Sequence, residues 1–269
     1  MRTRALCMAA ALTVHSVQTA AAQSEVDCVL EPAARVTISA KAEGTIREIP
    51  VGRGDLVEKG DLLVRLDAEL ESLQLELAQA RAESDLDLRG QRERLLLRQK
   101  EYDRVEQLSQ RNIAATSALD DAGIELSLTE LALEQAKFDR KLAAIEVRQA
   151  QALLDRRSVQ SPLTGRVVAV DAAVGEFANE QTSIMEIVQT DPIHVEVFAP
   201  GELFGRITEG EIHEVVLMPP LDGRFNATVA VVDRLFDTAS GTFGVRLEID
   251  NPKSIVPSGA RCRILFGAG

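Results

Sequence analysis

The middle of the chain, residues 67–157, constrains the fold most, because it contains no proline and only two glycines, Gly90 and Gly123. Leu, Ala, Glu, Gln and Arg, which all favour helix, dominate its composition. The segments on either side differ sharply from it in composition. We therefore expect the middle of the chain to be helical almost throughout.

Apolar residues in this region recur at alternating spacings of three and four, which is the heptad pattern of a coiled coil. Two consecutive four-residue steps, from Ala80 to Ser84 to Leu88, form a stutter in that pattern. The first stripe consists of Leu70, Leu73, Leu77, Ala80, Ser84, Leu88, Leu95, Tyr102 and Val105. The second stripe consists of Ile124, Leu128, Leu131, Phe138, Leu142, Ile145 and Ala152.

The segment RNIAATS (111–117) separates the two stripes. Two arms of about 40–45 residues, each about 60–65 Å long at the rise of an α-helix, would flank this polar turn. The pattern predicts an antiparallel helical hairpin, which suits a protein that must reach a distant partner. A coiled-coil spacer without a binding role is the alternative.

An internal repeat flanks the helical region. The first copy is GTIREIPVGRGDLVEKGDLL (44–63) and the second is GRVVAVDAAVGEFANEQTSI (165–184). Aligning Gly44 with Gly165 also matches Ile46 with Val167 and Gly54 with Gly175. Each copy is too short to close a core alone. We therefore expect the two copies to form one small β-sandwich into which the hairpin is inserted.

The remainder of the chain, residues 189–269, alternates apolar and polar residues in short runs separated by turn signals such as Asp222-Gly223 and Ser258-Gly259. This spacing predicts a small antiparallel β-barrel. The fold class expected from the whole sequence is mixed, mainly β with a long α-helical hairpin.

The N-terminus has the features of a secretory signal peptide. Arg2 and Arg4 precede a short apolar stretch, and the small residues Ala20 to Ala22 precede a cleavage site after Ala22. The apolar stretch is shorter than the roughly 20 residues that a membrane span requires. We expect residues 1–22 to be removed on export, with a retained anchor as the alternative.

The formal net charge of −12 argues against nucleic acid as a partner, because nucleic acid favours a basic surface. The histidines His194 and His213 stand alone, and no cluster of cysteine and histidine has the spacing of a metal site. We expect no catalytic residues, no cofactor and no metal, and therefore no enzyme.

Two cysteines, Cys28 and Cys262, would remain after cleavage of the signal peptide. Each lies in phase with the apolar residues of a short predicted strand, and the exported chain enters an oxidising compartment. We expect a disulfide between them. The alternative is a pair of buried free thiols.

Four stretches carry a resemblance to a known family: GTIREIPVGRGDLVEKGDLLVRLD (44–67), SPLTGRVVAVDAAVGE (161–176), DTASGTFGVRLEIDNP (237–252) and PSGARCRILF (257–266). In this order they resemble the periplasmic adaptors, or membrane fusion proteins, of the HlyD-like and RND efflux type. The resemblance implies a split lipoyl-like β-sandwich with an inserted antiparallel coiled coil, followed by an antiparallel β-barrel. The implied domains are the signal peptide (1–22), the first lipoyl-like half (23–66), the hairpin (67–157), the second lipoyl-like half (158–188) and the β-barrel (189–269).

The resemblance further implies a subunit that links an inner-membrane RND-type transporter to a TolC-type outer-membrane channel in a tripartite efflux system. It would lie in the periplasm, held at the inner membrane by its transporter, and would form a homo-oligomer, a hexamer in the family. An adaptor of an ABC-type exporter, or a periplasmic scaffold without a channel partner, are the alternatives. Many relatives build a membrane-proximal domain from both chain ends, and we expect that domain to be missing here.

Family hairpins often carry an Arg, a Leu four residues later and a Ser seven residues beyond that, near the tip. Arg104 and Leu108 match this pattern, whereas the third position falls on Ala115. The expected channel-docking residues are Arg104, Leu108, Arg111, Asn112, Thr116 and Ser117. The expected structural turns of the lipoyl-like halves are at Gly44, Gly54, Gly60, Gly165 and Gly175.

The first half also resembles lipoyl and biotinyl carrier domains, which hold a modified lysine at the turn between their halves. Here the helical region occupies that turn, and its lysines, Lys100, Lys137 and Lys141, all lie inside predicted helices. A carrier role is therefore not expected.

Overall fold

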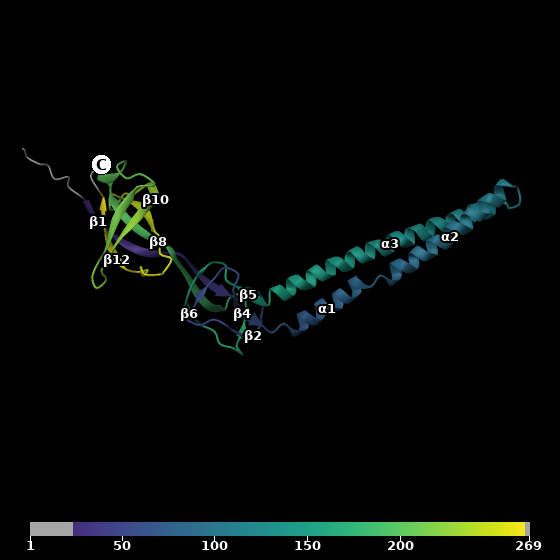
Figure 1. The fold of residues 1–269 in the computed structure, drawn as a ribbon, viewed down its shortest axis with the longest axis horizontal. Coiled ribbons are helices and arrows are strands. Elements are labelled where there is room, and N and C mark those ends of the chain that lie inside the picture. The colour runs from purple at the N-terminus through teal and green to yellow at the C-terminus, as the bar shows by residue number, and fades with distance from the viewer. Residues whose placement is uncertain (1–23, 267–269) are drawn as a thin grey trace, which may run out of the picture. The chain divides into compact units, whose positions relative to one another are not determined.

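The computed structural model describes residues 24–266, which divide into two units (Figure 1). The hairpin unit is Arg35–Val188, and the terminal unit combines the described residues up to Ala34 with those from Gln189 onward. Strands β1 (Ser24–Ser39) and β8 (Ser183–Pro200) contribute residues to both units. The predicted signal peptide, residues 1–22, lies outside the described residues.

Three helices form the hairpin, as Figure 1 shows. Its first arm contains α1 (Glu69–Glu83) and α2 (Leu86–Gln110), and its second arm is α3 (Thr116–Asp155). Both α1 and α2 pack along α3. The prediction of a helical hairpin in a mainly β chain is confirmed.

The first arm is interrupted, although the sequence predicted one continuous helix. At Ser84 the backbone is extended, with a ψ of 118°, and α2 begins two residues later. Ser and Asp are weak helix formers because their side chains compete for backbone hydrogen bonds. The break coincides with the stutter between Ala80 and Leu88.

The surface that joins the two arms differs from the predicted stripes. In the first arm, Leu88 is buried, but Leu70, Leu73 and Leu77 are exposed. The whole second stripe, from Ile124 to Ala152, also lies on the exposed surface of α3. The side chains buried between the arms are Ala78, Leu88, Leu133, Ala136 and Ala150. Assigning the second stripe to the hairpin interface is therefore wrong, because a face rich in alanine packs there instead.

The β part of the hairpin unit has two sets of strands. One set has the order β5-β4-β2-β7, and the other runs β8-β6-β3. Its strands are β2 (Gly44–Glu48), β3 (Leu56–Val57), β4 (Leu62–Leu66), β5 (Ser158–Gln160), β6 (Gly165–Val170) and β7 (Phe177–Ala178).

The two copies of the repeat bind each other reciprocally. The N–H of Gly54 donates to the carbonyl of Val167, and the N–H of the equivalent Gly175 donates to the carbonyl of Ile46, both at 2.8 Å. Likewise β3 pairs with β6 of the other copy, and β7 pairs with β2. The apolar residues of both copies share one core, which includes Ile46, Val167 and Ile184. Neither copy completes this core alone.

The five glycines predicted to form turns of the lipoyl-like halves serve two different purposes. Gly54, Gly60 and Gly175 have φ values of 98°, 99° and 93°, which an L side chain rarely adopts. Gly44 and Gly165 instead begin strands β2 and β6, so their assignment as turns is wrong. They are glycines because neighbours approach closely: a Cβ on Gly44 would lie 2.7 Å from Nη1 of Arg157, and one on Gly165 would overlap the backbone carbonyl of Val188.

Replacing Gly165 by Ala should lower the free energy of unfolding by at least about 1–3 kcal/mol, because backbone atoms of β8 cannot move aside as a flexible side chain can. Gly90→Ala is the matched control, since nothing lies within 4 Å of its Cβ position. In the interior of α2 that change should stabilise the protein by up to about 1 kcal/mol. Denaturant unfolding of both variants checks this, and equal stabilities would contradict it.

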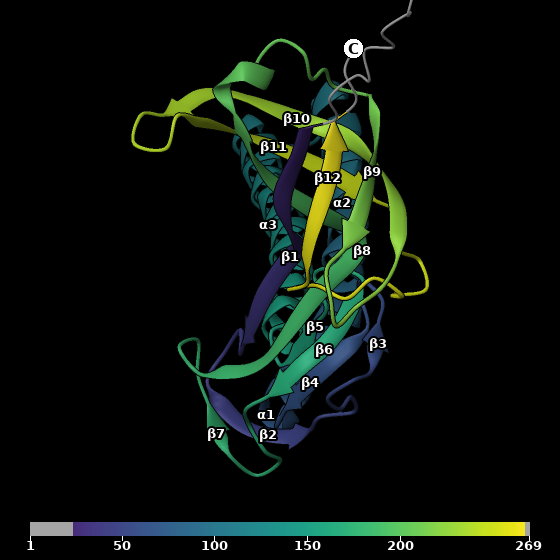
Figure 2. The same ribbon diagram turned by 90° about the vertical axis from the view of Figure 1, so that its left-hand side faces the viewer.

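The terminal unit is an antiparallel arrangement of strands in the order β1-β12-β9-β10-β11-β8 (Figure 2). Its core contains Leu30, Val195, Phe243, Leu247 and Ile264, each almost fully buried. A short 3₁₀ helix, η1 (Gly201–Leu203), follows β8. The remaining strands are β9 (Ile212–Leu217), β10 (Arg224–Asp237), β11 (Thr242–Ile249) and β12 (Arg261–Phe266).

The start of β1 belongs to this unit, so the prediction that residues 23–66 together form the first lipoyl-like half is wrong for residues 24–34. Residues 24–29 pair with β12, as Figure 2 shows. Cys28 lies opposite Cys262 in this register, their Cα atoms are 4.9 Å apart, and their sulfurs form a disulfide. The bond therefore joins the first and last strands of the unit, which are separated by 234 residues in sequence.

Candidate functional site

The tip of the hairpin is a short turn that ends α2 and starts α3. Asn112 has a φ of 57°. Its N–H donates to the carbonyl of Ser109 at 2.8 Å, and the N–H of Ile113 donates to the carbonyl of Leu108 at 2.9 Å. This pair of bonds is a Schellman motif, in which a left-handed residue satisfies the last carbonyls of a helix. Asn tolerates that conformation better than most residues, so Asn112 explains why the helix stops here.

The predicted docking residues gather around this turn. Leu108 is half-buried, and Arg104 is exposed one turn before it on α2. On the other side, α3 starts with no side-chain cap on Ala115, and Thr116 and Ser117 are exposed in its first turn. Arg111 and Asn112 are exposed at the turn itself. The tip therefore presents guanidinium, amide and hydroxyl groups on one small surface.

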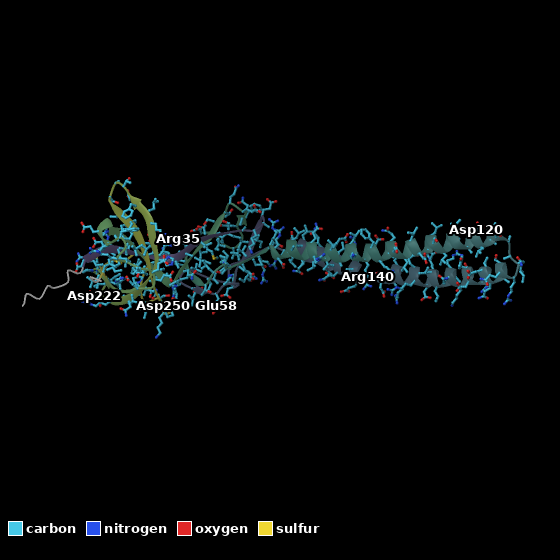
Figure 3. The ribbon with its side chains drawn as sticks, turned by 90° about the horizontal axis from the view of Figure 1, so that it is seen from above. Arg35, Glu58, Asp120, Arg140, Asp222 and Asp250 are labelled. Atoms are coloured by element: carbon cyan, nitrogen blue, oxygen red, sulfur yellow. A yellow bond between two sulfur atoms is a disulfide. The ribbon has the colours of Figure 1, made fainter. Side chains whose placement is uncertain are left out.

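Sequence reasoning did not single out Ile113, whose side chain is 69% exposed at the end of the turn. A large apolar side chain in a polar turn was the available signal. Acidic side chains such as Asp120 (Figure 3) follow within the first turns of α3, and no Lys or Arg occurs between Arg111 and Lys137. The tip combines an apolar centre with basic groups from α2 and acidic groups from α3, which suits contact with a protein surface.

Two arginines that follow α3 fix the base of the hairpin to loops of the β part. Arg157 forms an ion pair with Glu71 of α1, and its guanidinium donates to the backbone carbonyl of Glu43 at 2.6 Å. Arg156 donates to the carbonyl of Lys41 and pairs with Glu180 at 3.0 Å. The side chains of Arg157 and Glu71 are only 21% and 12% exposed, so this ion pair is shielded from solvent. These contacts tie the end of α3 to the start of α1 and to the segments before β2 and after β7.

Shifted pKa values within residues 24–266 arise mainly from local hydrogen bonds. The pKa of Arg98 is raised by its hydrogen bond to Glu101, and the pKa of Glu211 is lowered mainly by hydrogen bonds from Thr208. His194 and His213 are mostly buried rather than on the surface, each beside one glutamate. Residues 24–266 contain no group of three or more side chains suited to hold a metal ion. Within the same range, none of the helices combines the length and apolar character needed to cross a bilayer.

Comparison with known proteins places the chain in a family. The family described as "CzcB-like, barrel-sandwich hybrid domain" matches residues 34–189, which is more than half of the chain. The chain belongs to this family. The resemblance to membrane fusion proteins stated from the sequence is confirmed.

Similar proteins include the nickel and cobalt resistance protein CnrB of Cupriavidus metallidurans, which is 25% identical over 83% of this chain and 54% of its own length. The pyoverdine export membrane fusion protein PvdR of Pseudomonas aeruginosa is 27% identical over 67% of this chain and 47% of its own length. The chain thus spans about half the length of the curated relatives that it matches.

The crystal structure of MacA from Actinobacillus actinomycetemcomitans has the same fold. Its TM-score is 0.78 at 19% sequence identity, and the match covers 93% of this chain and 79% of that one. Membrane fusion adaptors are non-enzymatic linkers, so the prediction that the chain is not an enzyme is confirmed.

Proposed function

We propose that this chain is the periplasmic adaptor subunit of a tripartite efflux system, which links an inner-membrane RND-type transporter to a TolC-type outer-membrane channel. The helical hairpin carries the proposal. It is fixed at its base by Arg156 and Arg157, and it presents an exposed, mixed-charge tip at its other end. An arm of this kind serves a protein that bridges two partners.

The relatives support an export role. PvdR is named as an export membrane fusion protein, and CnrB is named for metal resistance. The chain works by geometry in this proposal: its β units hold the transporter, and the hairpin tip meets the channel. In domain terms, residues 35–66 and 158–188 are the lipoyl-like halves, residues 67–157 the hairpin, and residues 189–269 with the start of β1 the β-barrel, and several copies assemble into a ring.

Charge reversal at the tip tests the channel contact. Arg104→Asp and Leu108→Glu should each abolish efflux, because an unfavourable charge at a packed contact costs on the order of several kcal/mol. The measurement is growth in the presence of compounds to which a deletion strain becomes sensitive. Periplasmic protein level and helix content by circular dichroism establish that the variants fold.

Arg92→Asp and Leu96→Glu are the matched controls, since both side chains are exposed on α2 but lie farther from the tip. They should leave efflux near the wild-type level. If cells that make the tip variants at wild-type abundance keep full resistance to these compounds, the tip does not make the proposed contact with the channel. If the chain co-purifies with an ABC-type exporter, that exporter takes the place of the RND-type transporter in the proposal. If it co-purifies with neither a transporter nor a channel, the scaffold function is the one that remains.

A further inference from the structure

The two cysteines of the terminal unit are enclosed in its core. Cys28 and Cys262 are 4% and 0% exposed, and both pack in the cluster that contains Leu30 and Ile264. Thiol–disulfide exchange requires a thiolate to reach the sulfur that it attacks, so access to the sulfur controls its rate. A second protein therefore cannot react with either cysteine while the unit is closed.

Strand β12 closes the terminal unit. It lies between β1 and β9 in the strand order, pairing with residues 24–29 of β1 on one side and with β9 on the other (Figure 2). It also contributes Cys262, Ile264 and Phe266 to the core. Until β12 is in place, Cys28 lacks the strand that lies opposite it and is open to a second protein.

The order of residues in the chain separates the two cysteines in time. An exported chain leads with its N-terminal end, so Cys28 arrives 234 residues ahead of Cys262. At the usual rate of synthesis this interval is on the order of 10–50 s. No cysteine lies between the two. The hairpin unit, Arg35–Val188, arrives in the same interval, and its core contains no residue of β12, so it can fold while the Cys28 thiol waits.

We propose that the chain is a substrate of an exported thiol-oxidising protein with a reactive Cys-X-X-Cys disulfide, which bonds to Cys28 before β12 is in place. The Cys28 thiolate attacks this disulfide and forms a mixed disulfide with one of its sulfurs. The other sulfur of the oxidising protein leaves as a thiolate and takes up a proton. This inference rests on the proposed function only in that the chain must reach the periplasm.

Pairing of β12 with β1 completes the reaction. Cys262 lies opposite Cys28 in this register, with the two Cα atoms 4.9 Å apart, inside the range of about 4.4–6.8 Å usual for disulfides. The Cys262 thiolate attacks the sulfur of Cys28, the mixed disulfide breaks, and the oxidising protein leaves as a dithiol. The chain has then given up two electrons and two protons. The strand that closes the unit therefore also releases the oxidising protein.

The first test compares oxidation before and after closure. The reduced, purified chain is mixed with an oxidised Cys-X-X-Cys protein either during refolding from denaturant or after refolding is complete. Oxidation of the refolded chain should be at least about a hundredfold slower, because buried sulfurs react only when the unit opens. A reduced chain that folds only once it is oxidised would support the same order. Equal rates for a chain in which hydrogen exchange shows β12 to be protected beforehand would overturn the proposal.

The matched control carries its cysteine pair on the outer face of the same two strands. Asp27 and Arg263 lie opposite each other, next to the natural pair, and both are exposed. In the variant C28S/C262S/D27C/R263C, the rates before and after refolding should agree within about threefold, because no side chain covers the sulfurs. Slow oxidation of this pair after refolding would mean that burial is not what protects Cys28 and Cys262, which contradicts the proposal.

The second test asks whether the oxidising protein waits on Cys28. Pulse-labelled cells are quenched with acid, free thiols are blocked, and conjugates of the chain with the oxidising protein are separated without reductant. Cys262→Ser and Cys28→Ser each leave one cysteine in the mature chain, and the two differ in how long that cysteine is exposed. Conjugates should be at least about fivefold more abundant with Cys262→Ser, because Cys28 meets the oxidising protein for longer.

Equal amounts of conjugate with the two variants, or none with either, would overturn the proposal. Neither test contains a step of efflux, and neither requires a transporter or a channel. Failure of this inference is therefore distinguishable from failure of the proposed function, which is measured as resistance in cells.

Discussion

Deleting residues 96–102 of α2 together with residues 123–129 of α3 should abolish efflux while both β cores stay folded. Each deletion removes seven residues, so the side chains that face the other arm keep their phase. The two segments lie at one level, since Tyr102 lies beside Gly123. The arm becomes about 10 Å shorter, which is too short for a bridge of fixed span. The buried cores of the two units contain no residue of either segment.

The control keeps the length and changes the sequence. Residues 96–102 are replaced by a copy of 89–95, and residues 123–129 by a copy of 130–136, so that the arm keeps its reach. This variant should retain efflux, whereas the shortened one should not. Both variants should show the thermal unfolding midpoint of the wild-type β units. The hairpin is inserted as a loop of the split β part, and a moderate change in the length of a loop has little effect on stability. Efflux by the shortened variant would mean that reach is not the purpose of the hairpin.

Removing the disulfide should lower the free energy of unfolding by about 2–5 kcal/mol. Cys28 and Cys262 join the first and last strands of the terminal unit, and both are buried. Without the bond, the unfolded chain regains the freedom of a loop of more than 200 residues, because the cysteines are 234 positions apart. Denaturant unfolding of Cys28→Ser, Cys262→Ser and the double variant measures the loss.

Three features separate loss of the bond from a packing defect. The two single variants and the double variant should unfold at similar denaturant concentrations, because each breaks the same bond. A reductant should destabilise the wild type but not the variants. Mature periplasmic protein, denatured without reductant, should contain no titratable thiol. Two thiols per chain would contradict the prediction.

Several features of this chain follow from local sequence. The absence of proline from residues 67–157 predicts the helices, because proline is the strongest helix breaker. The repeat predicts that two segments share one β domain. Gly54 and Gly175 occupy equivalent positions in the two copies, and both adopt a positive φ. The position of the hairpin tip is also local, because Asn112 ends the helix with bonds to residues within five positions.

Other features depend on contacts that the sequence does not encode locally. Gly44 resembles a turn glycine in the sequence. Glycine is needed there because the guanidinium of Arg157, more than a hundred residues later, lies where a side chain would begin. The start of β1 lies next to the first repeat copy in sequence, yet it pairs with β12 at the other end of the chain. Contacts between residues far apart in the sequence decide both cases.

The two faces of α3 show most clearly which features the local sequence determines and which depend on tertiary contacts. The sequence by itself determines that α3 is a long helix with heptad spacing and places many of its large apolar residues in one stripe. It does not determine which face meets the other arm, because two faces of the same helix share the same period. The tertiary structure buries Ala136 and Ala150 against the first arm, since small side chains let helices approach closely, and leaves Leu131 and Phe138 exposed. Periodicity is a property of one helix, whereas the choice of face depends on which helices pack together.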